Sequence, residues 1–455
     1  MSLDAIARDW MSAALVPQPI GAVVEVAGTI IQIAMTGAAL GDVVAIDTVD
    51  RSAPPFGGAA RREQVPARDH ERRHEVLCEV VGFRDRTLLA IPLTPARRIA
   101  PGAPVRLRGA MSTLAAGDAL IGRLLDPFGK PLDGRPAPRC NERVPLDGGA
   151  LPVDARGQVD KRFETRVRAI DALLTCGQGQ RVGIFAGAGC GKSVLVEQIA
   201  GHADADVIVV GLVGERGREV RELMQSPRRD RMVMIAATAD RSPLERIRGA
   251  LAATAIAEYF RDRGKNVLLV LDSLTRFAMA LRELGLALGE PPATKGYPPS
   301  VFATLPRLLE RVAPRRDGGS ITGFYTVLVE GDDLADPVAD SARSLLDAHI
   351  VLSRELASRG QFPAIDVLAS ASRVMRRVST PAILALATRA RESLSRRRHA
   401  QELQALGAYN PGSNPALDHA VALGDAIDTW ARQAPHEPTD LEQAIRGLAT
   451  ALETK

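Results

Sequence analysis

The chain has few aromatic residues, few cysteines and no long apolar run. Aromatic residues make up 4% of its 455 positions, too few for an evident platform on which nucleic-acid bases stack. The cysteines, Cys78, Cys140, Cys176 and Cys190, are widely spaced and form no Cys-x-x-Cys or Cys/His pattern, which argues against a zinc motif and indicates reduced thiols. No apolar run approaches membrane-spanning length, and no basic segment leads into an apolar core near the N-terminus. We therefore expect a cytoplasmic protein whose membrane contact is peripheral.

An excess of charge of one sign is also missing. The chain has 58 basic and 54 acidic residues, a net charge of +4. Because nearly all the positive charge is arginine in an alanine-rich chain, this balance gives no reason to expect a nucleic-acid partner. The length of 455 residues, with 46% hydrophobic residues, allows two or three domains with ample core.

What the chain does contain is a glycine-rich loop between a strand-like and a helix-like segment. The run Ala186-Gly-Ala-Gly-Cys-Gly-Lys-Ser193 follows the apolar segment 181–185 and precedes the segment 194–200. Glycine tolerates the backbone angles of a tight anion-binding loop, and a helix N-terminus adds partial positive charge. The loop therefore predicts a nucleotide-phosphate site formed by Gly187, Ala188, Gly189, Cys190, Gly191, Lys192, Ser193 and Val194.

Two residues of this loop have specific chemical roles. Lys192 is predicted to reach the β and γ phosphates, and Ser193 to bind Mg²⁺. The pattern departs from the usual form at one position, because Ala186 stands where a first glycine is expected. The alternative is a strand–helix turn whose glycines serve close packing and which binds no ligand.

Two acidic residues follow other apolar strands. Asp272 ends the run 266–271, and Glu215 comes soon after the run 207–210. Because parallel strands present their carboxyl ends at one edge of a sheet, we expect both near the loop. Asp272 would support Mg²⁺, and Glu215 would orient and polarise an attacking water. The alternatives are a helix-capping aspartate and an exposed glutamate paired with neighbouring arginines.

The pattern along the chain predicts an α/β protein with an N-terminal β-barrel and a C-terminal helical domain. Short β-branched runs separated by Gly and Pro indicate the barrel, with an exposed loop at 51–75. Alternating strand and helix patterns indicate a mostly parallel sheet with helices on both sides. The expected divisions are an N-terminal amphipathic helix (1–20), the β-barrel (21–110), a connecting segment (111–164), the α/β domain (165–378) and the helical domain (379–455).

Four motifs make these features specific. They are Gly211-Leu-Val-Gly-Glu-Arg-Gly-Arg-Glu-Val220, Leu271-Asp-Ser-Leu-Thr-Arg-Phe-Ala278, Gly289-Glu-Pro-Pro-Ala-Thr-Lys-Gly-Tyr-Pro-Pro-Ser-Val-Phe302 and Pro363-Ala-Ile-Asp-Val-Leu-Ala-Ser-Ala-Ser-Arg373. With these four motifs together, the chain resembles the rotary F1/V1-type ATPases and, within them, the type III secretion system export ATPases of flagella and injectisomes. The resemblance runs from about Gly21 to the C-terminus and is most specific over 165–378. It implies a RecA-like P-loop fold for that central domain.

The resemblance also implies roles for individual residues. Arg373 matches the arginine that enters the neighbouring subunit's site, where a permanently charged, planar donor group stabilises the transferred phosphoryl group. Phe362 matches an aromatic residue that stacks on adenine, with a core phenylalanine as a close alternative. Tyr409 is expected to close the same pocket from the C-terminal domain. The predicted catalytic residues are thus Glu215, Lys192 and Arg373, the metal-binding residues are Ser193 and Asp272, and the cofactors are ATP and Mg²⁺.

One chain carries both the loop and the arginine, so identical copies can complete every site. An arginine that acts across a head-to-tail contact implies a closed ring, and we expect a homohexamer. The resemblance implies an ATP-hydrolysing ring motor of a type III protein export apparatus, injectisome favoured over flagellar. Turnover would be coupled to chaperone release and to substrate unfolding or loading. The implied partners are stalk and stator proteins, secretion chaperones, export substrates and, peripherally at the cytoplasmic face, the inner-membrane export gate; no nucleic acid is expected.

Other functions are open from the residues. A catalytic or nucleotide-binding subunit of an F/V-type ion-translocating ATPase shares the fold, but its usual Gly-Glu-Arg-Thr-Arg-Glu-Gly motif differs from Gly214-Glu-Arg-Gly-Arg-Glu-Val220. A non-catalytic subunit is expected to lack the carboxylate of Glu215. A ring RNA translocase is expected to carry an aromatic nucleic-acid barrel, and a structural module is expected not to bind Mg-ATP.

Overall fold

The structure is a computed structural model that divides into two units. The described residues are 20–48, 74–93, 98–226, 228–329, 331, 333 and 335–453. One unit contains residues 1–112 with 287–289, and the other contains 113–286 with 290–455. The expected N-terminal helix lies outside the described residues except for Ile20, and so does most of the expected loop at 51–75.

The first unit is built on a closed β-barrel. Its strands pair antiparallel in the order β1-β2-β5-β4-β3-β6. Alternate residues point inward, and Val23, Ile31, Ile33, Val44 and Ile46 are among the buried side chains of its core. The strands are β1 (Ile20–Ala27), β2 (Ile30–Ala34), β3 (Asp42–Thr48), β4 (His74–Arg84), β5 (Thr87–Pro92) and β6 (Pro104–Ala110). The barrel predicted from the β-branched runs is confirmed.

The second unit contains an eight-stranded sheet. All neighbouring strands in it are parallel except the last pair at one edge, which is antiparallel. In spatial order the strands are β18 (Ala371–Ser372), β17 (Ala348–Leu352), β12 (Arg181–Ala186), β16 (Ser320–Leu328), β15 (Asn266–Asp272), β13 (Val207–Val213), β14 (Met232–Ala237) and β8 (Arg123–Leu125). This confirms the mostly parallel sheet expected for the central domain.

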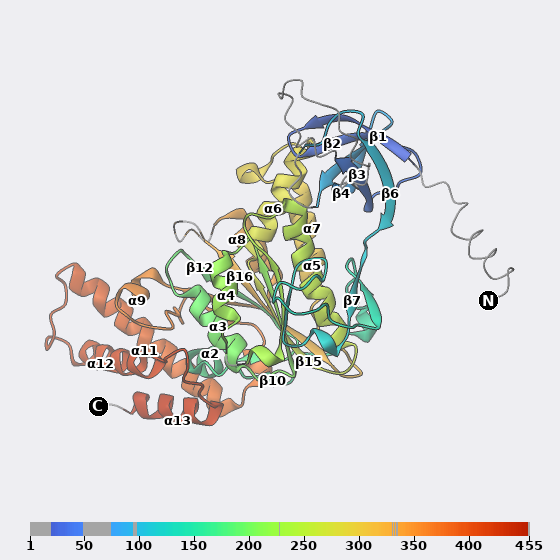
Figure 1. Ribbon diagram of the computed structural model, residues 1–455. Helices are drawn as coiled ribbons and strands as arrows, with labels where there is room; N and C mark the ends of the chain where they lie inside the picture. Colours follow the sequence, from blue (N-terminus) through green and yellow to red (C-terminus); the bar gives the residue numbers. More distant parts are fainter. Residues whose placement is uncertain are drawn as a thin grey trace, which may run out of the picture. The chain divides into compact units, whose positions relative to one another are not determined.

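Helices cover both faces of this sheet, as Figure 1 shows. In β13, Val210 packs in one hydrophobic core and its neighbour Val209 in the other. Helices packed on the Val210 face include α2 (Arg168–Leu173), α3 (Lys192–His202) and α4 (Gly217–Leu223). Helices on the Val209 face include α5 (Pro243–Arg261), α6 (Leu274–Ala287), α7 (Pro299–Leu309) and α8 (Pro337–Leu345). The strands are mostly apolar because both faces are buried.

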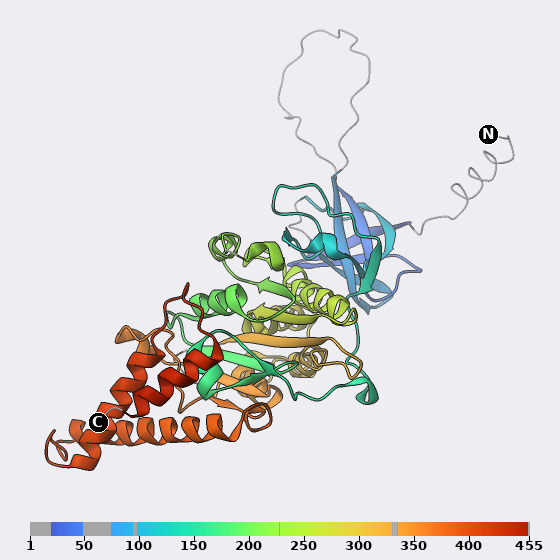
Figure 2. The same ribbon diagram turned by 90° about the horizontal axis from the view of Figure 1, so that it is seen from below.

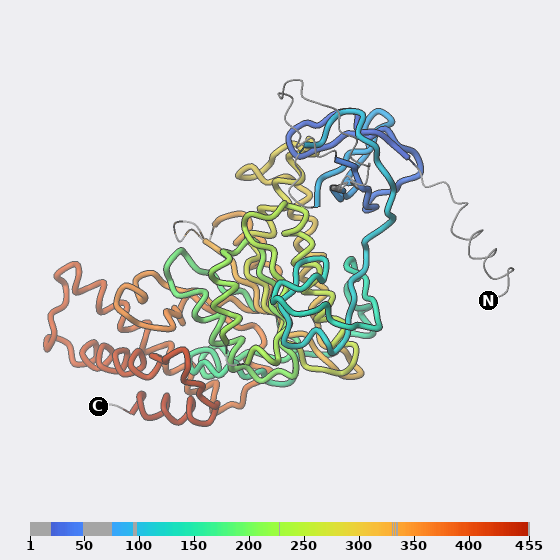
Figure 3. Tube along the Cα trace, in the orientation of Figure 1, coloured from blue at the N-terminus to red at the C-terminus, as the bar shows by residue number. Residues whose placement is uncertain are grey.

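The chain ends in a helical domain, which confirms that expectation. Its helices are α11 (Pro381–Ala405), α12 (Pro415–Ala431) and α13 (Leu441–Leu452). Each begins after a side chain whose oxygen accepts a backbone N–H of the first turn; these caps are Thr380, Asn414 and Asp440. Helices α11 and α12 lie side by side in the orange-to-red part of Figures 2 and 3. In the part of the chain that the structure describes, no helix is long and apolar enough to cross a membrane.

Short elements connect these parts. Within 111–164, β8 forms the sheet edge beside β14, and β7 (Thr113–Ala116) pairs with β9 (Glu142–Pro145). The remaining elements are β10 (Arg162–Phe163), β11 (Cys176–Gly177), α9 (Arg354–Ser358) and α10 (Met375–Val378).

Candidate functional site

The glycine-rich loop joins the carboxyl end of β12 to the first turn of α3. Gly189 and Gly191 have φ values of 83° and 84°, in the left-handed region that favours glycine. Helix α3 begins directly after Gly191, at Lys192. The loop thus presents backbone N–H groups and a helix N-terminus together, which suits an anion.

One side of the loop is open to solvent and the other is packed. Ala188, Gly189, Ser193 and Val194 are exposed, whereas Cys190 is buried. The exposed side is therefore the one from which a phosphate can approach, and the Cys190 side chain serves as packing beneath it.

Three charged side chains predicted from separate motifs meet beside this loop. The Lys192 ammonium lies 2.5 Å from Asp272 Oδ1 and 3.4 Å from Glu215 Oε1. A fourth side chain, Thr326 in the middle of the site, donates from its hydroxyl to the same Asp272 oxygen at 2.5 Å. The four residues come from or follow the neighbouring strands β12, β16, β15 and β13, so the parallel register itself assembles the cluster.

Burial and charge shift the titration of this cluster. Burial, reinforced by the Asp272 carboxylate, raises the pKa of Glu215 above its usual value. Burial alone would lower the pKa of Lys192, but Asp272 and Glu215 outweigh it and the pKa is raised. The site therefore holds a charged ammonium against carboxylates, one of which takes up a proton more readily than an ordinary glutamate.

The oxygen donors at the loop fit a magnesium ion that is shared with phosphates. Ser193 Oγ lies in the exposed first turn of α3 and donates to Glu219 at 3.3 Å. Within the described ranges, no group of three or more His, Cys, Asp or Glu side chains could hold a metal by itself. Such a group is not required for Mg²⁺, which proteins usually bind through one or two of their own oxygens together with substrate phosphates and water. Ser193 and Asp272 are the residues here that match that chemistry.

Phe362 lies against the phosphate loop. A Cβ atom built on Gly191 would be 3.3 Å from two atoms of the Phe362 ring, and the phenylalanine is 43% exposed. The ring is therefore a half-exposed surface beside the loop and not a core side chain. The backbone N–H of Gln433, from the connection between α12 and α13, donates to the Phe362 carbonyl at 3.0 Å.

Tyr409 lies in the C-terminal helical domain, as expected. It lies in the connection between α11 and α12, is buried, and donates its hydroxyl to Asp418 at 2.5 Å. Among the described residues, the C-terminal contact to Phe362 comes from Gln433. This hydrogen bond joins the connection to the first turn of α12, and the closing of the nucleotide pocket by Tyr409 stays a prediction.

Arg373 lies near the amino ends of the parallel strands β17 and β12, whereas the loop follows the carboxyl end of β12. Ser372 is paired with Ala348 at the start of β17, and Ala348 is paired with Val182 at the start of β12, four residues before Ala186 and the loop. Four residues of a parallel strand span about 13 Å. Arg373 is exposed, and its guanidinium forms no ion pair with the part of the chain that the structure describes.

Comparison with known proteins agrees with this arrangement. The nucleotide-binding domain of the ATP synthase alpha/beta family matches residues 166–372, and the T3SS EscN ATPase C-terminal domain matches residues 379–450. A flagellum-specific ATP synthase of Salmonella typhimurium is 50% identical over 396 residues, which cover 84% of this chain and 87% of that protein. This chain belongs to the type III export ATPases of the ATP synthase alpha/beta family.

Export ATPases of both systems are similar to this chain. The type 3 secretion system ATPase of Pseudomonas syringae pv. tomato is 47% identical over 384 residues, 82% of this chain and 85% of that protein. The structure of the assembled ATPase EscN from the enteropathogenic E. coli type III secretion system has a TM-score of 0.84 at 39% identity and covers 95% of this chain. The whole of that chain is matched, so the similarity to these export ATPases extends beyond the P-loop domain.

Two residues of the site, Thr326 and Gln433, were not predicted from the sequence. Thr326 lies near the end of the buried strand β16 among other hydroxyl-bearing residues of that strand, so no sequence signal distinguished it. Gln433 is more than seventy positions from Phe362 along the chain, and no local pattern connects the two.

Proposed function

We propose that this chain hydrolyses Mg-ATP as a homohexameric ring motor of a type III export apparatus. The observation that carries the proposal is the position of Arg373, which lies at the amino ends of the strands, away from the phosphate loop at their carboxyl ends, and has no ion-pair partner among the described residues. An arginine in that position serves the loop of another copy, and a repeated head-to-tail contact closes as a ring. Each site then combines Lys192 and Glu215 of one subunit with Arg373 of its neighbour.

The residues divide the reaction between them. Lys192 exchanges its ion pairs for contacts with the β and γ phosphates. Ser193 and Asp272 would hold Mg²⁺, which when bound supplies positive charge beside the triphosphate. The Glu215 carboxylate accepts a hydrogen bond from the attacking water and takes its proton as the water oxygen bonds to the γ phosphorus. The bond to the bridging oxygen breaks, and ADP leaves with the electron pair. Arg373 stabilises the charge that spreads over the transferred group.

The export role rests on family membership. We propose that turnover drives chaperone release and substrate unfolding or loading, at the cytoplasmic face of the inner membrane beside the export gate. EscN has been solved in complex with its central stalk EscO, and that EscN chain matches this one with a TM-score of 0.81, which supports a stalk partner here. Stator proteins, chaperones and export substrates are further proposed partners. Relatives of both flagellar and secretion type are similar; we favour the injectisome on the runs 175–185 and 365–368.

The proposal is tested by the specific rate of Mg-ATP hydrolysis as a function of protein concentration. Sites completed between subunits require assembly, so the rate per chain should rise steeply with concentration. Lys192→Ala serves as the blank, because it removes the ammonium that the phosphates need. Nucleotide binding with no hydrolysis at any concentration would contradict the proposal and favour a non-catalytic subunit of an ion-translocating ATPase.

Replacement of Phe362 tests the base side of the site. Phe362→Ala should raise the Kd for Mg-ADP about tenfold, because base–aromatic stacking contributes roughly 1–3 kcal/mol. Phe83→Ala is the matched control, since Phe83 is also exposed but lies in the barrel strand β4. Titration calorimetry measures both. An unchanged Kd in Phe362→Ala would mean that the ring does not contact the base.

A further inference from the structure

The segment 361–363 has two different sides. Phe362 lies against Gly191 of the phosphate loop, whereas its neighbours Gln361 and Pro363 line a cavity of about 600 Å³ on the other side. The backbone bends at Phe362 and Pro363, and the neighbouring side chains lie on different sides of the segment. A ring that faces the nucleotide site is thus carried by a backbone that faces the C-terminal helices.

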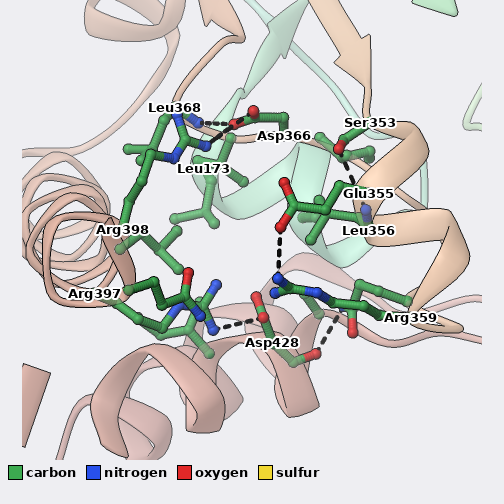
Figure 4. A pocket seen from close by; sticks show the side chains of 18 of the residues that line it. Leu173, Ser353, Glu355, Leu356, Arg359, Asp366, Leu368, Arg397, Arg398 and Asp428 are labelled. Atoms are coloured by element: carbon green, nitrogen blue, oxygen red, sulfur yellow. Dashed lines mark hydrogen bonds and ion pairs between the residues drawn. The ribbon is translucent and has the colours of Figure 1, made fainter. Parts of the chain in front are cut away.

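The cavity separates much of this segment from the helices behind it. Figure 4 shows three ion pairs at its border, Arg397 with Asp428 at 2.6 Å, Arg398 with Asp366 at 3.0 Å and Arg359 with Glu355 at 2.5 Å. Because side chains around a cavity lack packing partners on one side, the position of segment 361–363 depends more on its hydrogen bonds than on close packing.

Gln361 provides one set of those hydrogen bonds. Its side chain is 4% exposed, donates to the carbonyl of Asp428 at 2.8 Å and accepts from Arg432 Nε at 2.8 Å. Both partners lie at the C-terminal end of α12. The side chain amide is therefore satisfied by α12 alone, and it ties the segment to that helix.

Gln433 provides the second set, directly at Phe362. Its backbone N–H donates to the Phe362 carbonyl at 3.0 Å. Its side chain is also 4% exposed: the oxygen accepts from the Arg168 N–H at 2.9 Å, and the amide nitrogen donates to the carbonyls of Arg166 and Glu437 at 2.8 and 2.6 Å. Gln433 thus joins the start of α2, the α12–α13 connection and Phe362 in one hydrogen-bonded unit.

We propose that Gln361 and Gln433 are positioning residues, which hold the Phe362 ring over the loop and so set affinity for the base of the nucleotide. The proposal rests on the nucleotide site proposed above. Affinity for the base then depends on the position of α12, because Gln361 bonds to α12 and Gln433 lies just after that helix and bonds to Phe362. The phosphate loop does not depend on these glutamines, because it is held by β12 and α3.

The test compares a nucleotide with a ligand that has no base. Binding of a Mg-bound, non-hydrolysable ATP analogue and of Mg-tripolyphosphate is measured by titration calorimetry for the parent chain, Gln433→Ala and Gln361→Ala. The Kd for the analogue should rise about tenfold in each variant, the size of a lost base–aromatic contact, while the Kd for tripolyphosphate should not change. Gln401→Ala is the matched control, because Gln401 lines the same cavity and its side chain forms no hydrogen bond within the described ranges; both its Kd values should equal those of the parent.

A further variant distinguishes a loss of positioning from a folding defect. Arg432 is exposed, so Arg432→Ala should keep the fold while removing one hydrogen bond to Gln361. The Kd for the ATP analogue should rise by less than in the glutamine variants, and the Kd for tripolyphosphate should not change. The positioning role would be overturned if binding of the analogue and of tripolyphosphate were weakened equally in Gln433→Ala, Gln361→Ala and Arg432→Ala, or if binding were weakened in none of them. If the parent chain binds neither ligand, the proposed function fails instead, and the two failures are distinguished.

Discussion

Arg373→Ala is expected to lower kcat for ATP hydrolysis by about 10³-fold or more, the effect of losing an arginine finger in comparable phosphoryl-transfer enzymes. The Kd for Mg-ATP in assembled rings should stay close to that of the parent, because the phosphate loop, Lys192 and Phe362 are untouched. The reason lies in the register, which places Arg373 at the start of β17 and the loop after the end of β12. Steady-state rates and nucleotide titration, both above the concentration needed for assembly, measure the two quantities.

Arg377→Ala is the matched control for this variant. Arg377 is exposed four positions further on, in α10, so its removal changes net charge equally while leaving the proposed finger. Its kcat should remain near the parental value. Parental kcat in assembled Arg373→Ala rings would contradict the assignment.

Mixing two inactive variants shows whether the arginine acts between subunits. In rings that contain both Arg373→Ala and Lys192→Ala chains, some interfaces join an intact loop to an intact finger. Activity should therefore return on mixing and re-assembly. A mixture that is no more active than its separate components would place Arg373 outside the neighbouring site.

Glu215→Gln is expected to lower kcat by about 10² to 10⁴-fold, the usual contribution of a positioned general base. The amide keeps the size of the side chain but cannot accept the proton of the attacking water. Nucleotide binding should persist, because Lys192 retains its contact with Asp272. Glu222→Gln is the control, since Glu222 is an exposed residue of the neighbouring helix α4, 55% exposed at its side chain. A Glu215→Gln enzyme with parental kcat would remove Glu215 from the chemistry.

The pH dependence of kcat/KM should also show that Glu215 acts as the general base. Burial raises the pKa of Glu215, so as pH falls this carboxylate takes up a proton at a higher pH than an ordinary glutamate, whose pKa is about 4.3. Because only the deprotonated form can accept a proton from water, kcat/KM should decline on the acidic side above that value. The decline should be absent from the residual activity of Glu215→Gln. A profile that is flat down to the ordinary value would contradict a basic role.

Local sequence was sufficient to predict the loop and much of the site. Glycines at 189 and 191 permit the left-handed backbone that the structure has there, and these constraints act within a few residues. The meeting of Lys192, Glu215 and Asp272 was also predictable, because parallel strands bring their carboxyl ends to one edge and each acidic residue follows an apolar run. The barrel, the sheet and the C-terminal helices followed from hydrophobic periodicity in the same way.

Tertiary structure alone decided the contacts between distant segments. Thr326 reaches Asp272 because β16 lies between β12 and β15, an order that no single segment encodes. Gln433 reaches Phe362 because of how α12 and the connection after it pack, and no local pattern in the sequence indicates that contact. The separation of Arg373 from its own loop likewise needs the pairing of β17 with β12 and β18. Periodicity specifies which face of an element is buried, but register and partner are set by the packing of the whole domain.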